Sequence, residues 1–282
     1  MSVSAQLPPV IQRHELKYLI PWEMVEPISR FIRPYCSLDQ HSASARDHFY
    51  LVNSLYFDTR GFEFLYQRLW GKDIRFNMRV RAYADGTQPP YFLEIKQKKG
   101  SSVTKYRATI SAQEWPAILT APDTCLSEPD NPFNQRSKQL FMRLAASYNI
   151  EPKILTQYYR RAFFSTIDDY ARVTIDRNMR YQLESEYNLQ PGPNMAHYDN
   201  ETIYSTNQRT EARAVLELKC NIGQVPIWML DLIRHFELQQ MGFSKYMNSM
   251  LVAHIDNGNH YMDLSRQSAL HVNDSDPLYP HR

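Results

Sequence analysis

The chemistry of this chain is carried by charged side chains that recur at alternate positions in short segments of mixed polarity. Successive side chains of a β-strand point to opposite faces, so charges two or four residues apart lie on one face. Arginine binds phosphate oxygens as a bidentate fork, and lysine binds them as a point charge. Carboxylates among such groups either pair with them or hold a divalent cation together with phosphate oxygens. The spaced charges are Glu15/Lys17, Arg79/Arg81, Glu94/Lys96, Lys105/Arg107, Arg172/Asp176 and Glu217/Lys219.

The alternation is strictest in residues 76–99. Apolar and charged residues alternate on both sides of a turn that contains Asp85-Gly86 and Pro89-Pro90. This pattern predicts a β-hairpin with one apolar face and one charged face. The apolar positions are Met78, Val80, Ala82, Tyr91, Leu93 and Ile95, and the charged positions are Arg79, Arg81, Glu94, Lys96 and Lys98.

Composition narrows the classes of protein that the chain can belong to. Its 282 residues are 43% hydrophobic and 13% aromatic, and a net charge of +2 does not indicate a nucleic-acid binder. Most aromatic residues fall on apolar faces, which also disfavours nucleic acid. The three cysteines and nine histidines lack zinc-site spacing. No run of 18 apolar residues occurs, so we expect no membrane segment and a cytoplasmic location.

Periodicity and capping signals predict the order of strands and helices. Residues 37–47 and 121–132 are expected to be loops, and residues 179–212 a long excursion with room for irregular strands. Tyr56-Phe57-Asp58 is expected to be structural, with Asp58 capping a helix. Residues 10–256 are predicted to form a single domain between loose tails at 1–9 and 257–282. Strands are expected at 10–20, 48–58, 76–83, 91–99, 103–110, 153–165, 172–176 and 214–220, and helices at 21–33, 59–70, 111–119, 131–148, 226–236 and 244–255.

Short connections between these strands favour an antiparallel sheet. We predict an α+β fold in which an eight-stranded antiparallel β-barrel forms a tunnel with a charged lumen and helices packed outside. Basic side chains would outnumber the glutamates and Asp176 in this lumen, and neighbouring like charges would repel by several kcal/mol at an effective dielectric constant of ~20. A bound polyanion such as a chain of phosphates would offset that repulsion.

The charged segments also resemble a known family. They are similar to the VTC domain, the catalytic domain of the vacuolar transporter chaperone polyphosphate polymerase, in the triphosphate tunnel metalloenzyme superfamily. The resemblance runs in order through nearly the whole chain. It rests on Arg13-His-Glu-Leu-Lys17, Tyr56-Phe-Asp-Thr59, Arg79-Val-Arg81, Glu94-Ile-Lys96, Lys105-Tyr-Arg107, Tyr159-Arg-Arg-Ala-Phe163, Arg172-Val-Thr-Ile-Asp176, Glu217-Leu-Lys219 and Phe243-Ser-Lys-Tyr246.

The resemblance implies roles for individual residues. ATP, inorganic polyphosphate or triphosphate would be the ligand, and Mn²⁺ or Mg²⁺ would bind at Glu217 and Glu94. Glu15 would assist in binding the metal or orient a lysine. Arg161 is an additional basic residue of the same motifs. Lys245 is expected to begin a helix. The alternative to a binding role for this residue is an ordinary lysine on the surface. Catalytic phosphate contacts are implied for Lys17, Arg79, Arg81, Lys96, Arg160, Arg172 and Lys219, and further binding contacts for Lys105, Lys98, Arg107, Lys245 and Glu15.

One departure from the pattern affects the predicted reaction. Hydrolytic enzymes of the superfamily resemble ExExK at the first strand, where this chain has Arg13 in place of the first carboxylate. Loss of that carboxylate weakens metal-assisted activation of water. We therefore predict a metal-dependent, polyphosphate polymerase-like phosphotransferase. An inorganic or nucleoside triphosphatase of the same fold and a non-catalytic polyphosphate-binding module are the alternatives, and the sequence leaves the oligomeric state open.

Overall fold

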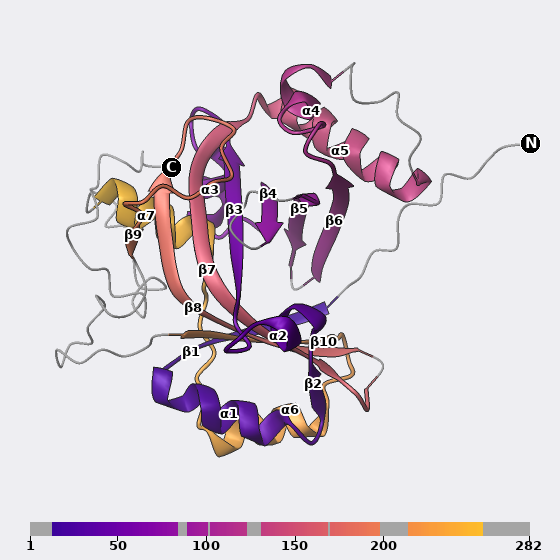
Figure 1. Cartoon of the computed structure of the whole chain (residues 1–282), viewed down its shortest axis with the longest axis vertical. Helices are drawn as coiled ribbons and strands as arrows, with labels where there is room; N and C mark the ends of the chain where they lie inside the picture. The colour runs from indigo at the N-terminus through magenta and orange to yellow at the C-terminus, as the bar shows by residue number, and fades with distance from the viewer. Residues whose placement is uncertain are drawn as a thin grey trace, which may run out of the picture.

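The protein is built on one strongly curved antiparallel sheet (Figure 1). The computed structural model describes residues 13–83, 89–100, 102–122, 131–168, 170–197 and 214–255. The predictions for the tails, for the turn at Asp85-Gly86 and for residues 123–130 and 198–212 lie outside the described residues.

Eight strands follow one another across the sheet in the order β1-β10-β8-β7-β3-β4-β5-β6, and all neighbours are antiparallel. Two short strands, β2 (Cys36–Leu38) and β9 (Ala196–His197), pair with β7 and β8. The predicted α+β fold with an antiparallel sheet is confirmed. The long strands are β1 (Arg13–Ile20), β3 (Tyr50–Asp58), β4 (Ile74–Tyr83), β5 (Tyr91–Lys99), β6 (Ser102–Ile110), β7 (Glu151–Ser165), β8 (Ala171–Leu183) and β10 (Ala214–Asn221).

The two faces of the sheet differ in chemistry, as the alternation predicts. Met78 and Val80 of β4 are fully buried on the convex face, whereas Arg79 and Arg81 point into a cavity on the concave face. The register places Arg79 opposite Glu94 of β5. The hairpin therefore has an apolar outer face and a charged inner face.

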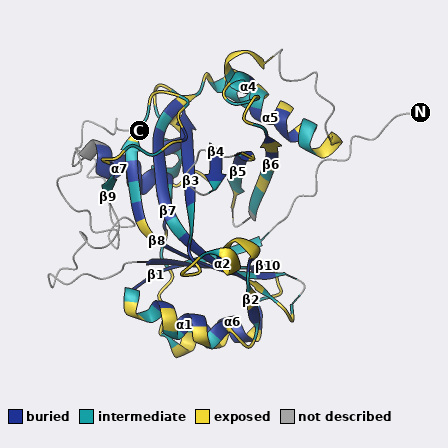
Figure 2. Ribbon diagram, in the orientation of Figure 1, coloured by how far each residue is buried: buried dark blue, intermediate teal, exposed yellow. Residues whose placement is uncertain are grey.

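Helices bury the convex face at two places (Figures 1 and 2). The 3₁₀ turn η1 (Trp22–Met24), α1 (Val25–Ile32) and α6 (Ile227–His235) pack on apolar residues of β1, β8 and β10. The helices α4 (Ala117–Thr120) and α5 (Pro132–Tyr148) pack on β4, β5 and β6. These contacts confirm that helices cover the outside of the sheet.

One helix packs on the concave face. α7 (Lys245–Ile255) contacts Val52, Ile154 and Val215, and Val215 lies two residues from the charged Glu217 on the same face. Lys245, the first residue of α7, lines the cavity. This helix therefore covers part of the charged face, and α3 (Glu63–Leu69) packs beside it.

The sheet differs from the predicted barrel in its closure. Among the strand pairings of the described residues, no backbone ladder joins β1 to β6, the two ends of the eight-strand path. Asn134 of α5 instead bonds both the N–H and the C=O of Thr109 on β6, at 2.6 and 2.9 Å. The N–H of Met241 donates to the carbonyl of Lys17 on β1. These edge groups therefore have partners other than the opposite edge.

Regular structure occurs in two segments outside the predicted strands and helices. Residues 37–47 include part of β2 and the helix α2 (Gln40–Ser44), whose N–H at Ser42 donates to the capping carboxylate of Asp39 at 2.8 Å. β8 continues through residues 179–183, the start of the segment predicted as a long excursion with room for irregular strands. Both segments pair with the 15-residue strand β7, a tertiary contact that local sequence does not specify. Within the described ranges, no helix is long and apolar enough to cross a bilayer.

Asp58 fixes α3 and α7 to the end of β3, which confirms its predicted capping role. Its carboxylate accepts hydrogen bonds from the N–H groups of Thr59, Phe64 and Leu65 at 2.7, 2.9 and 2.9 Å. The hydroxyl of Tyr246 on α7 donates to the same carboxylate at 2.5 Å. Burial raises the pKa of Asp58 although these bonds favour its charged form.

We predict that Asp58→Ala lowers the free energy of unfolding by at least about 2 kcal/mol, because a cap and several buried donors lose their acceptor. Urea denaturation measures this change. Asp231→Ala, at an exposed position on α6 with a weak 3.8 Å ion pair to Arg234, is the control and should change stability by less than about 0.5 kcal/mol. Equal effects of the two substitutions would contradict the anchoring role.

Candidate functional site

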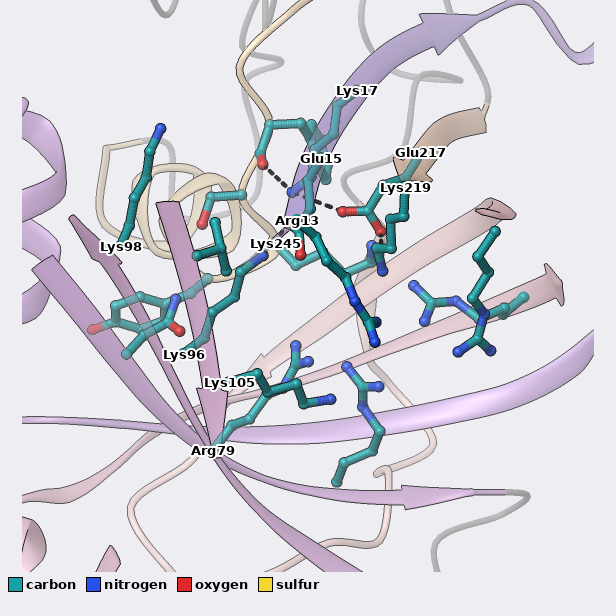
Figure 3. A pocket seen from close by; sticks show the side chains of 18 of the residues that line it. Arg13, Glu15, Lys17, Arg79, Lys96, Lys98, Lys105, Glu217, Lys219 and Lys245 are labelled. Carbon is teal, nitrogen blue, oxygen red and sulfur yellow. Dashed lines mark hydrogen bonds and ion pairs between the residues drawn. The ribbon is translucent and has the colours of Figure 1, made fainter. Parts of the chain in front are cut away.

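A cavity of about 1120 Å³ lies on the concave face of the sheet. Figure 3 shows lysine side chains from separate strands converging on it. Among the described lining residues, carboxylates come only from Glu15, Asp39 and Glu217. Every strand of the eight-strand path except β3 contributes a cation. The lining cations are Arg13, Lys17, Arg68, Arg75, Arg79, Arg81, Lys96, Lys98, Lys105, Arg107, Arg160, Arg172, Lys219 and Lys245.

Glu94 lies beneath the cavity wall and gathers four of these cations. Its carboxylate is paired with Arg79 at 2.7 Å, Arg81 at 3.5 Å, Lys105 at 2.5 Å and Arg107 at 2.7 Å, and the residue is 1% exposed. Burial would raise the pKa of Glu94, but the four cations outweigh it and hold that pKa well below its usual range. One buried anion therefore positions four donors from β4 and β6.

Asp176 has the same role on the opposite wall. Its carboxylate accepts two hydrogen bonds from Arg160, at 2.7 and 2.8 Å, and pairs with Lys245 of α7 at 2.5 Å. Arg160 and Lys245 hold the pKa of Asp176 below its usual range despite burial. The hydroxyl of Tyr158 is buried beside these groups without a hydrogen-bond partner within the described chain.

A third cluster lies where β1 meets β10. Glu217 pairs with Lys219 at 2.9 Å and with Lys17 at 3.7 Å, and Glu15 pairs with Lys96 across the open seam of the sheet. Burial lowers the pKa of Lys17 to about 7, although Glu217 opposes the shift. An anion beside Lys17 would favour its charged form.

Three cations lie at the end of the cavity near α3, where Phe64 and Phe76 also line the wall. Arg68 of α3, Arg75 of β4 and Lys98 of β5 form no ion pair with a carboxylate of the described residues. Burial, and then the charge of Arg75, lowers the pKa of Arg68 to about 10. Burial followed by Arg75 and Arg68 lowers the pKa of Lys98. We call these three residues the basic end.

The carboxylates fit a divalent cation that arrives with phosphate. The described residues contain no group of three His, Cys, Asp or Glu side chains that could hold a metal ion. Glu15 and Glu217, on the paired strands β1 and β10, both line the cavity. Magnesium sites in phosphate enzymes use one or two carboxylates with phosphate and water oxygens. Glu15 and Glu217 are paired with lysines but line the cavity, where phosphate oxygens could join them, whereas Glu94 is 1% exposed and does not line it.

The structure brings nearly all of the sequence-predicted residues to one place. Every predicted phosphate-contacting residue lines the cavity, including Lys98, Arg107 and Lys245. Glu94 lies behind the wall, so its surroundings do not support the metal role. Arg161 points away and pairs with Glu26 at 2.6 Å.

Sequence reasoning missed several residues of the site. Arg75 shares the alternation of Arg79 and Arg81, so the same pattern could have included it. Arg68 lies on a helix and could not be placed by strand alternation. Tyr56, expected to be only structural, accepts a hydrogen bond from Arg79 at 2.7 Å on the cavity side.

The comparisons with known proteins give the family. The profile of the VTC domain matches residues 12–254. The chain belongs to the VTC domain family. Its curved antiparallel sheet surrounds a basic cavity. No curated protein sequence gives a significant match.

Three solved structures have a similar arrangement of the chain. An adenylate cyclase candidate from Bacillus halodurans is 13% identical, with 83% of this chain and 94% of that chain covered and a TM-score of 0.45. An adenylyl cyclase candidate from Hippeastrum, described as having a dominant triphosphatase activity, is 12% identical, with 90% and 99% covered and a TM-score of 0.45. The Mimivirus capping enzyme triphosphatase is 11% identical, with 81% and 89% covered and a TM-score of 0.32.

We predict that Glu94→Gln destabilises this VTC domain by about 3–5 kcal/mol, because four converging cations lose their buried counter-charge. Urea denaturation at low and high NaCl measures the effect, and salt should restore part of the loss by screening. Glu151→Gln neutralises a carboxylate that is 50% exposed and has Lys153 as its single ion-pair partner among the described residues, so it should have a much smaller effect. A loss from Glu94→Gln as small as that from Glu151→Gln would show that the four cations do not depend on Glu94.

The stability difference between wild type and Glu94→Gln should depend on pH. Because the folded pKa of Glu94 lies well below its unfolded value of about 4.3, the carboxylate stabilises the fold fully above that value and loses its contribution as pH falls through the folded pKa. We expect the stability difference between wild type and Glu94→Gln to be constant from pH 8 to about pH 5 and to shrink below about pH 4. A difference that grows in acid would contradict the depressed pKa.

Proposed function

We propose that this VTC domain is a metal-dependent phosphotransferase that uses ATP to extend inorganic polyphosphate. The observation that supports this best is the continuous row of cations along the cavity. On β4 and its neighbours the cations extend from Arg75 to Arg81, six residues or ~20 Å of strand. A row of that length suits a chain of phosphates better than a single anionic group.

The reaction breaks the bond between the terminal phosphorus of ATP and its bridging oxygen, and an oxygen of the acceptor chain takes its place. ADP leaves and a new phosphoanhydride bond forms. Phosphoryl transfer depends on positioning and on neutralising charge rather than on covalent catalysis. Arg79, Arg81 and Arg160 line the cavity and would present guanidinium groups to the transferred group. Their orientations are fixed by Glu94 and Asp176.

Lysines supply the remaining charge. Lys17, Lys96, Lys105 and Lys219 reach the same space and would hold the non-bridging oxygens. A bound Mn²⁺ or Mg²⁺ would neutralise phosphate charge as a Lewis acid, and Glu217 with Glu15 would hold it. The assignment of these residues follows the family motif and their position in the cavity.

Arg13 favours transfer over hydrolysis. Its guanidinium lies 3.6 Å from the centre of the Tyr170 ring and donates to the hydroxyl of that tyrosine. Because a cation occupies the position where hydrolytic relatives have a carboxylate, the group that would help to activate water is missing. The acceptor is therefore expected to be a phosphate oxygen.

Incubation of the protein with ATP and Mn²⁺ tests the proposal. We expect ADP and a phosphatase-sensitive polymer on a gel, without an equivalent amount of free phosphate. Free phosphate equal to ADP, with no polymer, would identify a triphosphatase instead. Tight binding of polyphosphate without turnover of ATP would identify a non-catalytic binding module.

We predict that Lys105→Met slows ADP formation by at least about tenfold, because one preorganised charge on the phosphates is lost. Lys72→Met removes a lysine outside the cavity, beside Trp70, and serves as the matched control. Rates that fall equally in the two variants would contradict a specific role for Lys105.

A further inference from the structure

Opposite ends of the cavity have different chemistry. Antiparallel register places Tyr50 at the start of β3, Tyr83 at the end of β4 and Phe92 near the start of β5, all at one end of the sheet. Phe164, close to the end of β7, lies at this end as well. Arg75 and Lys98 of the basic end lie at the other extremity of β4 and β5.

Aromatic rings line the first of these ends. The ring of His41 from α2 stacks on Tyr83 with centroids 5.2 Å apart and an interplanar angle of 20°. Tyr50 lies 5.2 Å from His41, and Phe92 lies 5.4 Å from Tyr83. We call His41, Tyr50, Tyr83, Phe92 and Phe164 the aromatic end, and all five line the same cavity as the phosphate-binding cations.

The rings remain accessible to a ligand. Phe164 is 42% exposed, one of the most exposed large hydrophobic side chains of the described residues. His41 is exposed, and Phe92 and Tyr83 are half-buried. Because a planar base stacks on aromatic rings in a way that tolerates any base, such a surface suits a nucleobase.

Cations join the aromatic end to the phosphate site. The guanidinium of Arg172 lies 4.5 Å from the centre of the Phe164 ring, and that of Arg107 lies 4.4 Å from the centre of the Phe92 ring. Arg107 also pairs with Glu94 and so belongs to the central cluster of cations. Each arginine therefore lies between an aromatic ring and the phosphate path. In a bound nucleotide the junction of ribose and phosphate would lie at this point, between the base on the rings and the phosphates on the cations.

We propose that the aromatic end binds the nucleoside of ATP, so that the terminal phosphate points along the tunnel toward the basic end. This inference rests on the proposed use of ATP and adds a fixed polarity to it. The acceptor chain would then occupy the basic end, where Arg68, Arg75 and Lys98 meet no competing carboxylate. ATP and tripolyphosphate would share the central cations and differ only in their use of the aromatic end.

Binding of ATP and of tripolyphosphate, each measured by calorimetry with Mg²⁺, separates these contributions. In Phe164→Ala and His41→Ala we expect ATP affinity to fall about tenfold, in the range found for loss of a stacking partner. Tripolyphosphate affinity should change less than about twofold. In Lys105→Met, which removes one of the central cations, both affinities should fall together.

Trp70→Ala is the matched aromatic control, because Trp70 is 53% exposed and does not line the cavity. It should leave both affinities unchanged. Equal losses of ATP and tripolyphosphate in Phe164→Ala and His41→Ala, or no loss of either, would overturn the nucleoside site and leave the phosphate tunnel standing. A wild-type protein that binds neither ligand would overturn the proposed function itself.

Discussion

Repulsion among the cavity cations is the constraint on which the rest of this structure depends. Two like charges 4 Å apart repel by about 4 kcal/mol at an effective dielectric constant of 20, and the cavity gathers such charges from almost every strand. Glu94, Asp176 and Glu217 each hold two or more cations. These carboxylates fix the walls but leave an excess of positive charge, which the phosphates of a ligand can neutralise.

The apolar contacts lie where they support that arrangement. Clusters on the convex face hold the sheet in its curve, and α7 packs on the concave face and brings Lys245 to Asp176. Among the described residues no backbone ladder joins the end strands β1 and β6, and an ion pair links Glu15 of β1 to Lys96 of β5. Glu15 therefore takes part in this link and is also one of the two carboxylates proposed to hold a metal ion.

Strand alternation predicted the composition of the cavity because side chains at alternate positions along a strand lie on the same face of the sheet. Arg79, Arg81, Lys105 and Lys219 were placed in this way. The sequence could not predict that Glu94 is enclosed by four cations, since its partners come from the register of three strands. Arg68 and His41 lie on helices whose packing is tertiary, so the basic end and the aromatic end were seen only in the structure.

The most direct measurement is the free energy of unfolding of the metal-free protein as tripolyphosphate is added at constant ionic strength. If the cations converge on a phosphate path, stability rises as RT ln(1 + [L]/Kd), by about 2.7 kcal/mol at a hundredfold excess over Kd. Chloride at the same ionic strength should not reproduce this gain. Stabilisation by tripolyphosphate no greater than that by chloride would contradict the account.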